Sequence, residues 1–138
     1  MDLRTLPWWE YHNTIEYLPA SEFIKRTEKV PLNPELVKSL LDEWVINFLV
    51  TDCGEDYHAM SYAIPCNNLP RGFDRFGIIV NSEISLEEKV TAIIHETAHL
   101  IYKVNSTENI EPLIEKISAN FYNENKKLCH SLVEKYIH

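Results

Sequence analysis

Residues 76–101, FGIIVNSEISLEEKVTAIIHETAHLI, place a short apolar run, a turn and a long amphipathic run in direct succession. The run 76–80 is apolar and rich in β-branched residues, which predicts a strand that ends at Asn81. Ser85 and Glu88 form the capping box S-x-x-E, which predicts a helix that starts near Leu86 and continues to about Val104. This stretch therefore predicts a strand followed by a capped helix.

The predicted helix 86–104 has two different faces. His95 and His99 project from one face, among the neighbours Thr91, Ala92 and Tyr102. A pair of core histidines is expected within an apolar arc, so this pair is better placed to line a cleft. The opposite, apolar face consists of Val90, Ile93, Ile94, Leu100, Ile101 and Val104.

Residues 95–99 read HETAH, which is the pattern H-E-x-x-H. Helical residues four apart lie about 40° apart around the axis, so the imidazoles of His95 and His99 can bind one Zn²⁺ at ~2.0–2.1 Å. Glu96 lies about 100° round from His95, beside the metal, where it can take a proton from a water that zinc has acidified. The pattern predicts one zinc ion per chain and a general base.

A catalytic zinc site takes three protein ligands and keeps one position open, so a third ligand is expected from a neighbouring element. The sequence after the H-E-x-x-H helix offers three carboxylates, Glu108, Glu111 and Glu115. All three fall on the face of the predicted last helix that lies away from its Ile/Leu arc, together with Ser118, Ala119 and Tyr122. From the residues alone, any of the three can be the third ligand.

The remaining elements are predicted from periodicity. A helix over residues 34–48 is capped by Asn33, and a strand is indicated by the alternation of residues 58, 60, 62 and 64. A last helix is predicted from about residue 106 to about residue 136, and it tolerates Pro112 only in or near its first turn. The chain is thus expected to be α+β, with a small antiparallel sheet packed against the H-E-x-x-H helix and a long C-terminal helix. Residues 33–138 form this domain, and residues 1–32 are an aromatic-rich extension packed on it.

The stretch 76–101 resembles the core of the ImmA/IrrE-like zinc metallopeptidases, in which a strand, an Asn, a capped turn and an H-E-x-x-H helix follow in this order. The segment from Glu115 to Phe121, E-x-x-S-x-x-F, is similar to the downstream E-x-x-A-x-x-F signature of that family. The resemblance implies a minimal zincin-like, gluzincin-type domain in which His95, His99 and Glu115 bind zinc and Glu96 is the general base. It also implies a zinc-dependent endopeptidase that cleaves a regulatory protein, such as a transcriptional repressor, in a bacterium or phage.

Two further functions are expected around such a site. Tyr102 and Tyr122 are candidates for the donor that stabilises the oxyanion, because each lies two turns beyond a proposed ligand. Strand residues Gly77, Ile78, Ile79 and Val80 are expected to hold an extended peptide by edge pairing. The alternative is a zinc-binding regulatory or protein-interaction module without catalysis, although a purely structural zinc site has no need of Glu96.

Composition limits the partners and the compartment. The chain has 138 residues, 45% of them hydrophobic, which suffices for one core, and its formal net charge of −8 argues against direct nucleic-acid binding or an anionic membrane surface. No signal peptide and no membrane span are recognisable. The three cysteines, Cys53, Cys66 and Cys129, lack C-x-x-C spacing and are expected to be reduced thiols. We therefore expect a cytoplasmic protein with a protein or peptide partner.

Overall fold

The structure is a computed structural model that describes residues 19–43, 46–54, 58–64, 75–102, 104 and 107–137. The chain is α+β, as the sequence predicts. The expectations for residues 1–18 of the N-terminal extension and for Cys66 lie outside the described residues. No helix in the described part of the chain combines the length and apolar character that a bilayer crossing requires. The elements are α1 (Ala20–Lys29), α2 (Pro34–Glu43), β1 (Ile46–Thr51), β2 (Ala59–Ile64), β3 (Arg75–Asn81), α3 (Leu86–Tyr102), α4 (Glu111–Glu124), α5 (Lys126–Val133) and the 3-10 helix η3 (Glu134–Tyr136).

The described strands form a mixed sheet in the order β1-β3-β2. β3 pairs in parallel with β1, where Phe48 lies opposite Ile78, and antiparallel with β2, where Ser61 lies opposite Ile78. The expected small sheet is therefore present, but the prediction that it is antiparallel is wrong on its β1 side. Ile78 and Val80 are fully buried and face the helices, and Leu49 on the other face is 54% exposed.

The helix expected over residues 34–48 is shorter than predicted and is followed by a strand. α2 ends at Glu43, and β1 begins at Ile46. Asn33 caps α2 as expected, because its Oδ1 accepts a hydrogen bond from the backbone N–H of Leu36 at 3.0 Å. The apolar run that starts after Glu43 fits both a 3.6 and a 2 residue period, and its β-branched residues favour the strand when a partner strand is present.

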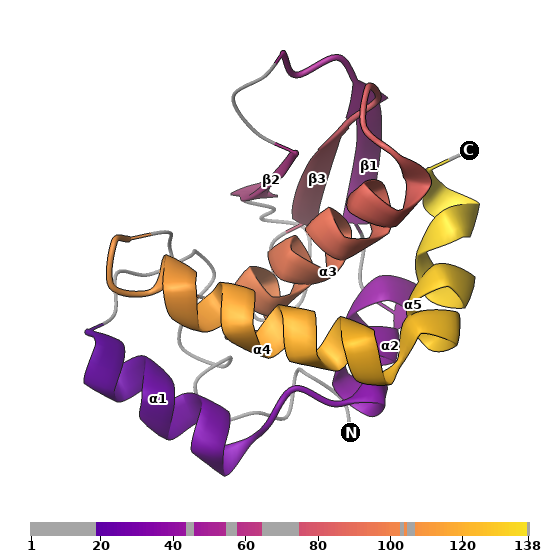
Figure 1. The fold of residues 1–138 in the computed structure, drawn as a ribbon. Coiled ribbons are helices and arrows are strands. Elements are labelled where there is room, and N and C mark those ends of the chain that lie inside the picture. Colours follow the sequence, from indigo (N-terminus) through magenta and orange to yellow (C-terminus); the bar gives the residue numbers. More distant parts are fainter. Residues whose placement is uncertain are drawn as a thin grey trace.

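Helix α3 occupies the centre of the molecule and contacts α1, α2, α4, α5, β2 and β3 (Figure 1). Its capping box is formed: the N–H of Glu88 donates to Ser85 Oγ at 3.1 Å, and the N–H of Ser85 donates to Glu88 Oε1 at 3.2 Å. The predicted apolar arc of this helix is fully buried. Because helices also cover the opposite face, the histidine face of α3 is enclosed rather than open to solvent.

The long C-terminal helix of the sequence analysis is two helices. α4 begins at Glu111 with Pro112 in its first turn, as expected, but it ends at Glu124. Asn125 has φ −135° and ψ 38°, and its side-chain Nδ2 donates to the carbonyl of Phe121 at 3.0 Å. Asparagine competes in this way with helical backbone hydrogen bonds, so the chain turns at Asn125 and α5 packs back against α2 and α3.

Helix α1 packs on the C-terminal end of α3. Phe23 is 1% exposed, and its ring meets the ring of Tyr102 edge to face at 5.6 Å. Arg26 Nη1 donates to the carbonyl of Tyr102 at 2.9 Å, and the hydroxyl of Tyr102 donates to the carbonyl of Val30 at 2.8 Å. These contacts hold the end of α3 from outside, close to the turn that carries His99.

Candidate metal centre

His95 and His99 lie one turn apart on α3 and face the start of α4. α4 runs antiparallel to α3, because its first residue, Glu111, contacts His99 near the end of α3, and Tyr122 near its end contacts Glu87 at the start of α3. The imidazoles are largely enclosed, with the side chains of His95 and His99 only 15% and 4% exposed. The helix pair therefore places carboxylates of α4 against two buried imidazoles.

Three side chains converge on one point between the helices. The Nε2 atoms of His95 and His99 are 3.2 Å apart. Glu111 reaches both of them, with Oε1 2.7 Å from Nε2 of His99 and Oε2 3.1 Å from Nε2 of His95. Glu111 is therefore the carboxylate that the fold places against the pair of Nε2 atoms.

The other nitrogen of each ring has its own acceptor. Nδ1 of His99 lies 2.9 Å from the carbonyl oxygen of Val104, and Nδ1 of His95 lies 2.9 Å from Oε2 of Glu115. Carbonyl and ionised carboxylate oxygens only accept hydrogen bonds, so both Nδ1 atoms are the donors. In the neutral rings the lone pairs are then on the two Nε2 atoms that face each other.

In this arrangement a positive charge at the convergence point, either a metal ion or a proton on one Nε2, stabilises the site. Two Nε2 lone pairs and the carboxylate of Glu111 are all acceptors, and they lie 2.7–3.2 Å apart in a nearly enclosed site. Such close acceptors repel one another unless a proton or a metal ion lies between them, and the low exposure of the rings increases the repulsion. The donor chemistry of the site therefore fits a bound cation.

The distance between the two Nε2 atoms also fits a pair of metal ligands. Two nitrogen ligands about 2.0–2.1 Å from a tetrahedral ion lie about 3.3 Å apart, close to the 3.2 Å between the Nε2 atoms. His95, Glu96 and His99 form a group that could hold a metal ion. Glu96 Oε2 is 4.0 Å from Nε2 of His95, and its side chain is 12% exposed. The carboxylate of Glu96 thus lies beside the convergence point, close enough to count among the groups that could bind an ion there.

The two other carboxylates expected near the site take different positions. Glu115 contacts His95 at Nδ1, on the side of the ring away from the convergence point, and its side chain is 69% exposed. Glu108 lies in the turn before α4. Of the three candidates for the third ligand, Glu111 faces the two Nε2 atoms and Glu115 instead holds one of the rings.

The two tyrosines considered as oxyanion donors have other partners. Tyr102 is fully buried, burial raises its pKa, and its hydroxyl donates to the carbonyl of Val30. The hydroxyl of Tyr122 lies 2.8 Å from Nε2 of His130 and 3.4 Å from Glu87, and burial together with the carboxylate of Glu87 raises its pKa. Both hydroxyls are therefore engaged in contacts between helices.

The residues expected to form a peptide-binding edge lie in the central strand of the sheet instead. Gly77, Ile78, Ile79 and Val80 belong to β3, which is the central strand of the described sheet and is paired on both sides. The prediction was wrong because residues 46–51, of which 46–48 were expected at the end of a helix, form the strand that covers this edge. The described edges of the sheet are β1 and β2, and β2 packs against α3.

Sequence reasoning missed two partners of the histidines. The carbonyl of Val104, which orients His99, lies beyond the end of α3, and a backbone acceptor leaves no sequence signal. The side chain of His130 is 28% exposed and contacts Tyr122. This contact exists because the chain turns at Asn125. Cys129 is buried, and burial raises its pKa to about 11.

The chain matches no protein-family model, no curated protein and no solved structure.

Proposed function

We propose that this protein is a zinc-dependent peptidase whose site is built from α3 and the first turns of α4. The observation that supports it is the convergence of two Nε2 lone pairs and the Glu111 carboxylate beside Glu96. Two imidazoles and one carboxylate are a ligand set used by catalytic zinc, with a fourth position left for water or substrate.

In this proposal Nε2 of His95, Nε2 of His99 and the carboxylate of Glu111 hold the ion. Glu115 is a positioning residue that fixes the ring of His95 through Nδ1, as the Val104 carbonyl does for His99. The resemblance to the ImmA/IrrE-like peptidases points to Glu115 as the third ligand. The distances favour Glu111, because Glu115 contacts the nitrogen of His95 that faces away from His99.

Zinc, when bound, makes a water molecule acidic near neutral pH and polarises a carbonyl group. Glu96 is placed to accept the proton of the attacking water and to hold it on its carboxylate. The same carboxyl group can then deliver this proton to the leaving amine. The low exposure of Glu96 strengthens its interaction with charges that form in the site.

The substrate of this proposal is an extended segment of a protein. β2 is a described edge strand that packs against α3, so a segment paired with β2 lies along the helix that carries His95 and His99. By the resemblance, the protein cleaved is a cytoplasmic regulatory protein such as a transcriptional repressor. The net charge of −8 favours contact with such a protein over contact with its DNA.

The test has two stages. First, zinc is measured in the untagged full chain, and one ion per chain is expected. Second, the zinc-loaded protein is incubated with a peptide mixture prepared from a bacterial proteome, and new termini are identified by mass spectrometry. Parent protein is compared with Glu96→Gln and with Glu22→Gln, a matched exchange on α1.

Cleavage by the parent and by Glu22→Gln, with loss in Glu96→Gln at unchanged zinc content, supports the peptidase. Zinc binding with no cleavage of any peptide by the parent overturns catalysis in favour of a zinc-dependent interaction module. Absence of zinc after reconstitution overturns the metal site itself.

A further inference from the structure

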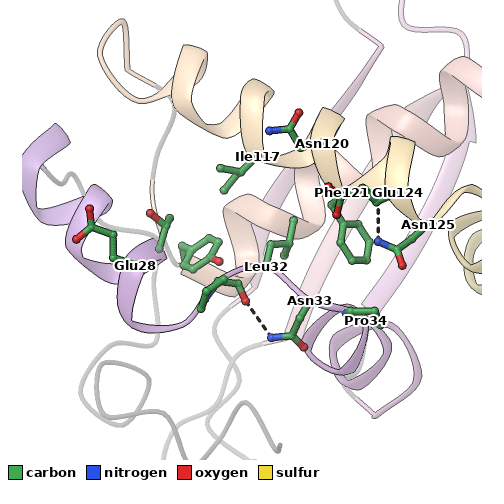
Figure 2. A pocket seen from close by; sticks show the side chains of 12 residues that line it. Glu28, Leu32, Asn33, Pro34, Ile117, Asn120, Phe121, Glu124 and Asn125 are labelled. Carbon is green, nitrogen blue, oxygen red and sulfur yellow. Dashed lines mark hydrogen bonds between the residues drawn. The ribbon is translucent and has the colours of Figure 1, made fainter.

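A second concave site lies on the other side of α4 from the metal centre. Its cavity has a volume of about 510 Å³. Figure 2 shows side chains of α1, of the connection to α2 and of α4 around it. A cavity of this size is within the usual range of binding pockets, about 300–1,000 Å³. The lining residues are Thr27, Glu28, Pro31, Leu32, Asn33, Pro34, Tyr102, Ile117, Asn120, Phe121, Glu124 and Asn125.

The pocket and the metal centre use opposite faces of α4. Glu111 and Glu115 lie within about 40° of each other around the helix axis. Ile117 and Phe121 lie more than about 80° away from that face, and Asn120 and Glu124 lie nearly opposite it. A ligand can therefore occupy the pocket without contacting the histidines.

The floor of the pocket is apolar and well supported. Leu32, Ile117 and Phe121 provide its apolar surface, and Phe121 is only 4% exposed. Asn33 and Asn125 are held by hydrogen bonds to the carbonyls of Pro31 and Phe121, both at 2.9–3.0 Å (Figure 2). The walls are thus fixed by the fold before any ligand arrives.

The charges of the pocket have one sign. Glu28 lines it from α1 and Glu124 lines it from α4, both as exposed carboxylates. Among the described residues that line the pocket, none is Lys, Arg or His. Exposed like charges without a cation between them favour a cationic ligand, and the net charge of −8 adds to this preference.

We propose that this pocket binds a polypeptide segment in which a Lys or Arg residue flanks an apolar residue. A basic side chain combines an aliphatic stem, which suits the apolar floor, with a cationic head for Glu28 or Glu124. The exposed amide of Asn120 at the rim can bond to the main chain of such a segment (Figure 2). The pocket is an interaction site independent of zinc and of the proposed peptidase activity.

The experiment uses the ¹⁵N-labelled full chain and two synthetic probes. One is the acetylated and amidated peptide Gly-Lys-Leu-Lys-Gly, and the other replaces both lysines by glutamates. The basic peptide is expected to shift the side-chain amide signals of Asn120 and Asn125, and the acidic peptide is not. Raising the salt concentration weakens the effect, because exposed charges are screened.

Two variants decide the role of the carboxylates. The double variant Glu28→Gln with Glu124→Gln is expected to bind the basic peptide about tenfold more weakly, whereas Glu22→Gln on α1 binds it like the parent. These side chains are exposed, so the exchanges preserve the fold, which circular dichroism checks. Asn120→Trp, which fills the mouth of the pocket, is expected to abolish the shift at Asn125.

Several outcomes overturn the proposal. These are equal shifts from the acidic peptide, full affinity in the double variant, or shifts confined to the signals of Glu111 and Glu115. A free amine such as phenethylamine that binds as tightly as the peptide would also overturn the polypeptide assignment. All measurements are repeated with a chelator, and unchanged binding there separates this site from the metal centre.

Discussion

The two ends of the α3–α4 contact each enclose a histidine with a carboxylate nearby, but their protons are arranged differently. At one end, His95, His99 and Glu111 direct three acceptors at one point. At the other end, the hydroxyl of Tyr122 lies between His130 and Glu87.

The end with Tyr122, His130 and Glu87, here called the tyrosine end, contains a hydroxyl donor and needs no ion. The hydroxyl of Tyr122 can donate to Nε2 of His130 or to Glu87, and Nδ1 of His130 lies 3.6 Å from the carboxylate of Glu134. The single O–H of Tyr122 donates to one of these two acceptors, and the exposed carboxylate of Glu87 is also open to water. At the end with His95 and His99, the Nδ1 protons of both rings go to Val104 and Glu115, so in neutral rings neither Nε2 atom carries a proton.

This difference shows why a buried histidine and a nearby carboxylate are not sufficient evidence for a metal site. The decisive feature is the direction of the second ring nitrogen, because its acceptor fixes where the lone pair points. The same pair of helices thus contains a cluster of converging acceptors that fits a cation and a hydrogen-bond network that has a hydroxyl donor of its own.

The largest expected effect is at the end with His95 and His99. His99→Ala removes one of the converging lone pairs, and we expect it to bind no zinc at micromolar concentrations, whereas His130→Ala keeps one zinc per chain. The measurement is metal analysis after dialysis, with circular dichroism as the control for folding. Full zinc content in His99→Ala would break the distinction between the two ends.

The next effect separates the two carboxylates of α4. Glu111→Gln is expected to weaken zinc binding by more than about 100-fold, and Glu115→Gln by about 10–100-fold, the range typical of residues that orient a ligand. Competition with a chelating dye measures both affinities. The reverse order would make Glu115 the ligand and Glu111 the accessory group.

A smaller effect is expected at the tyrosine end. Tyr122→Phe removes the hydroxyl that joins α4 to α5 and to the start of α3, which lowers the free energy of unfolding by about 1–2 kcal/mol. Urea denaturation of the metal-free protein measures this loss. The added stability on saturation with zinc is expected to be the same as in the parent, and a reduced zinc effect would show that the two ends are coupled.

The smallest effect concerns the exposed cap of α3. Hydrogen bonds from Ser85 lower the pKa of Glu88 below its ordinary value of 4.5. A carboxyl whose pKa is lower in the folded state adds stability above the unfolded pKa, and this stability is lost as the pH falls through the folded value. The stability difference between parent and Glu88→Gln is therefore expected to decrease below about pH 4.5, as urea denaturation at several pH values can show. A difference that does not change with pH would show that the ionised form has no special role.

The sequence predicted the elements whose signals are local. The capping box of Ser85 and Glu88, the helix with its two histidines, the cap at Asn33 and the place of Pro112 in a first turn all depend on residues within a few positions of one another. Strands β2 and β3 were also recognised, since alternation and β-branched composition are local properties.

The predictions failed where contacts between segments distant in the sequence determine the secondary structure. Residues 46–51 form a strand because β3 is available as a partner, and that pairing removes the edge expected at Gly77, Ile78, Ile79 and Val80. The end of α4 at Asn125 depends on a side-chain bond and on space for α5 beside α2 and α3.

The sequence alone determined that two imidazoles and Glu96 share one region of one helix, because the spacing of residues 95, 96 and 99 and the 3.6-residue turn require it. It left Glu108, Glu111 and Glu115 equivalent, since all lie on one face of a following segment. Only the tertiary structure placed Glu111 at the two Nε2 atoms and Glu115 behind His95. The physical reason is that the offset between two packed helices is set by the whole core around them, and one helical turn of offset exchanges one carboxylate for the other.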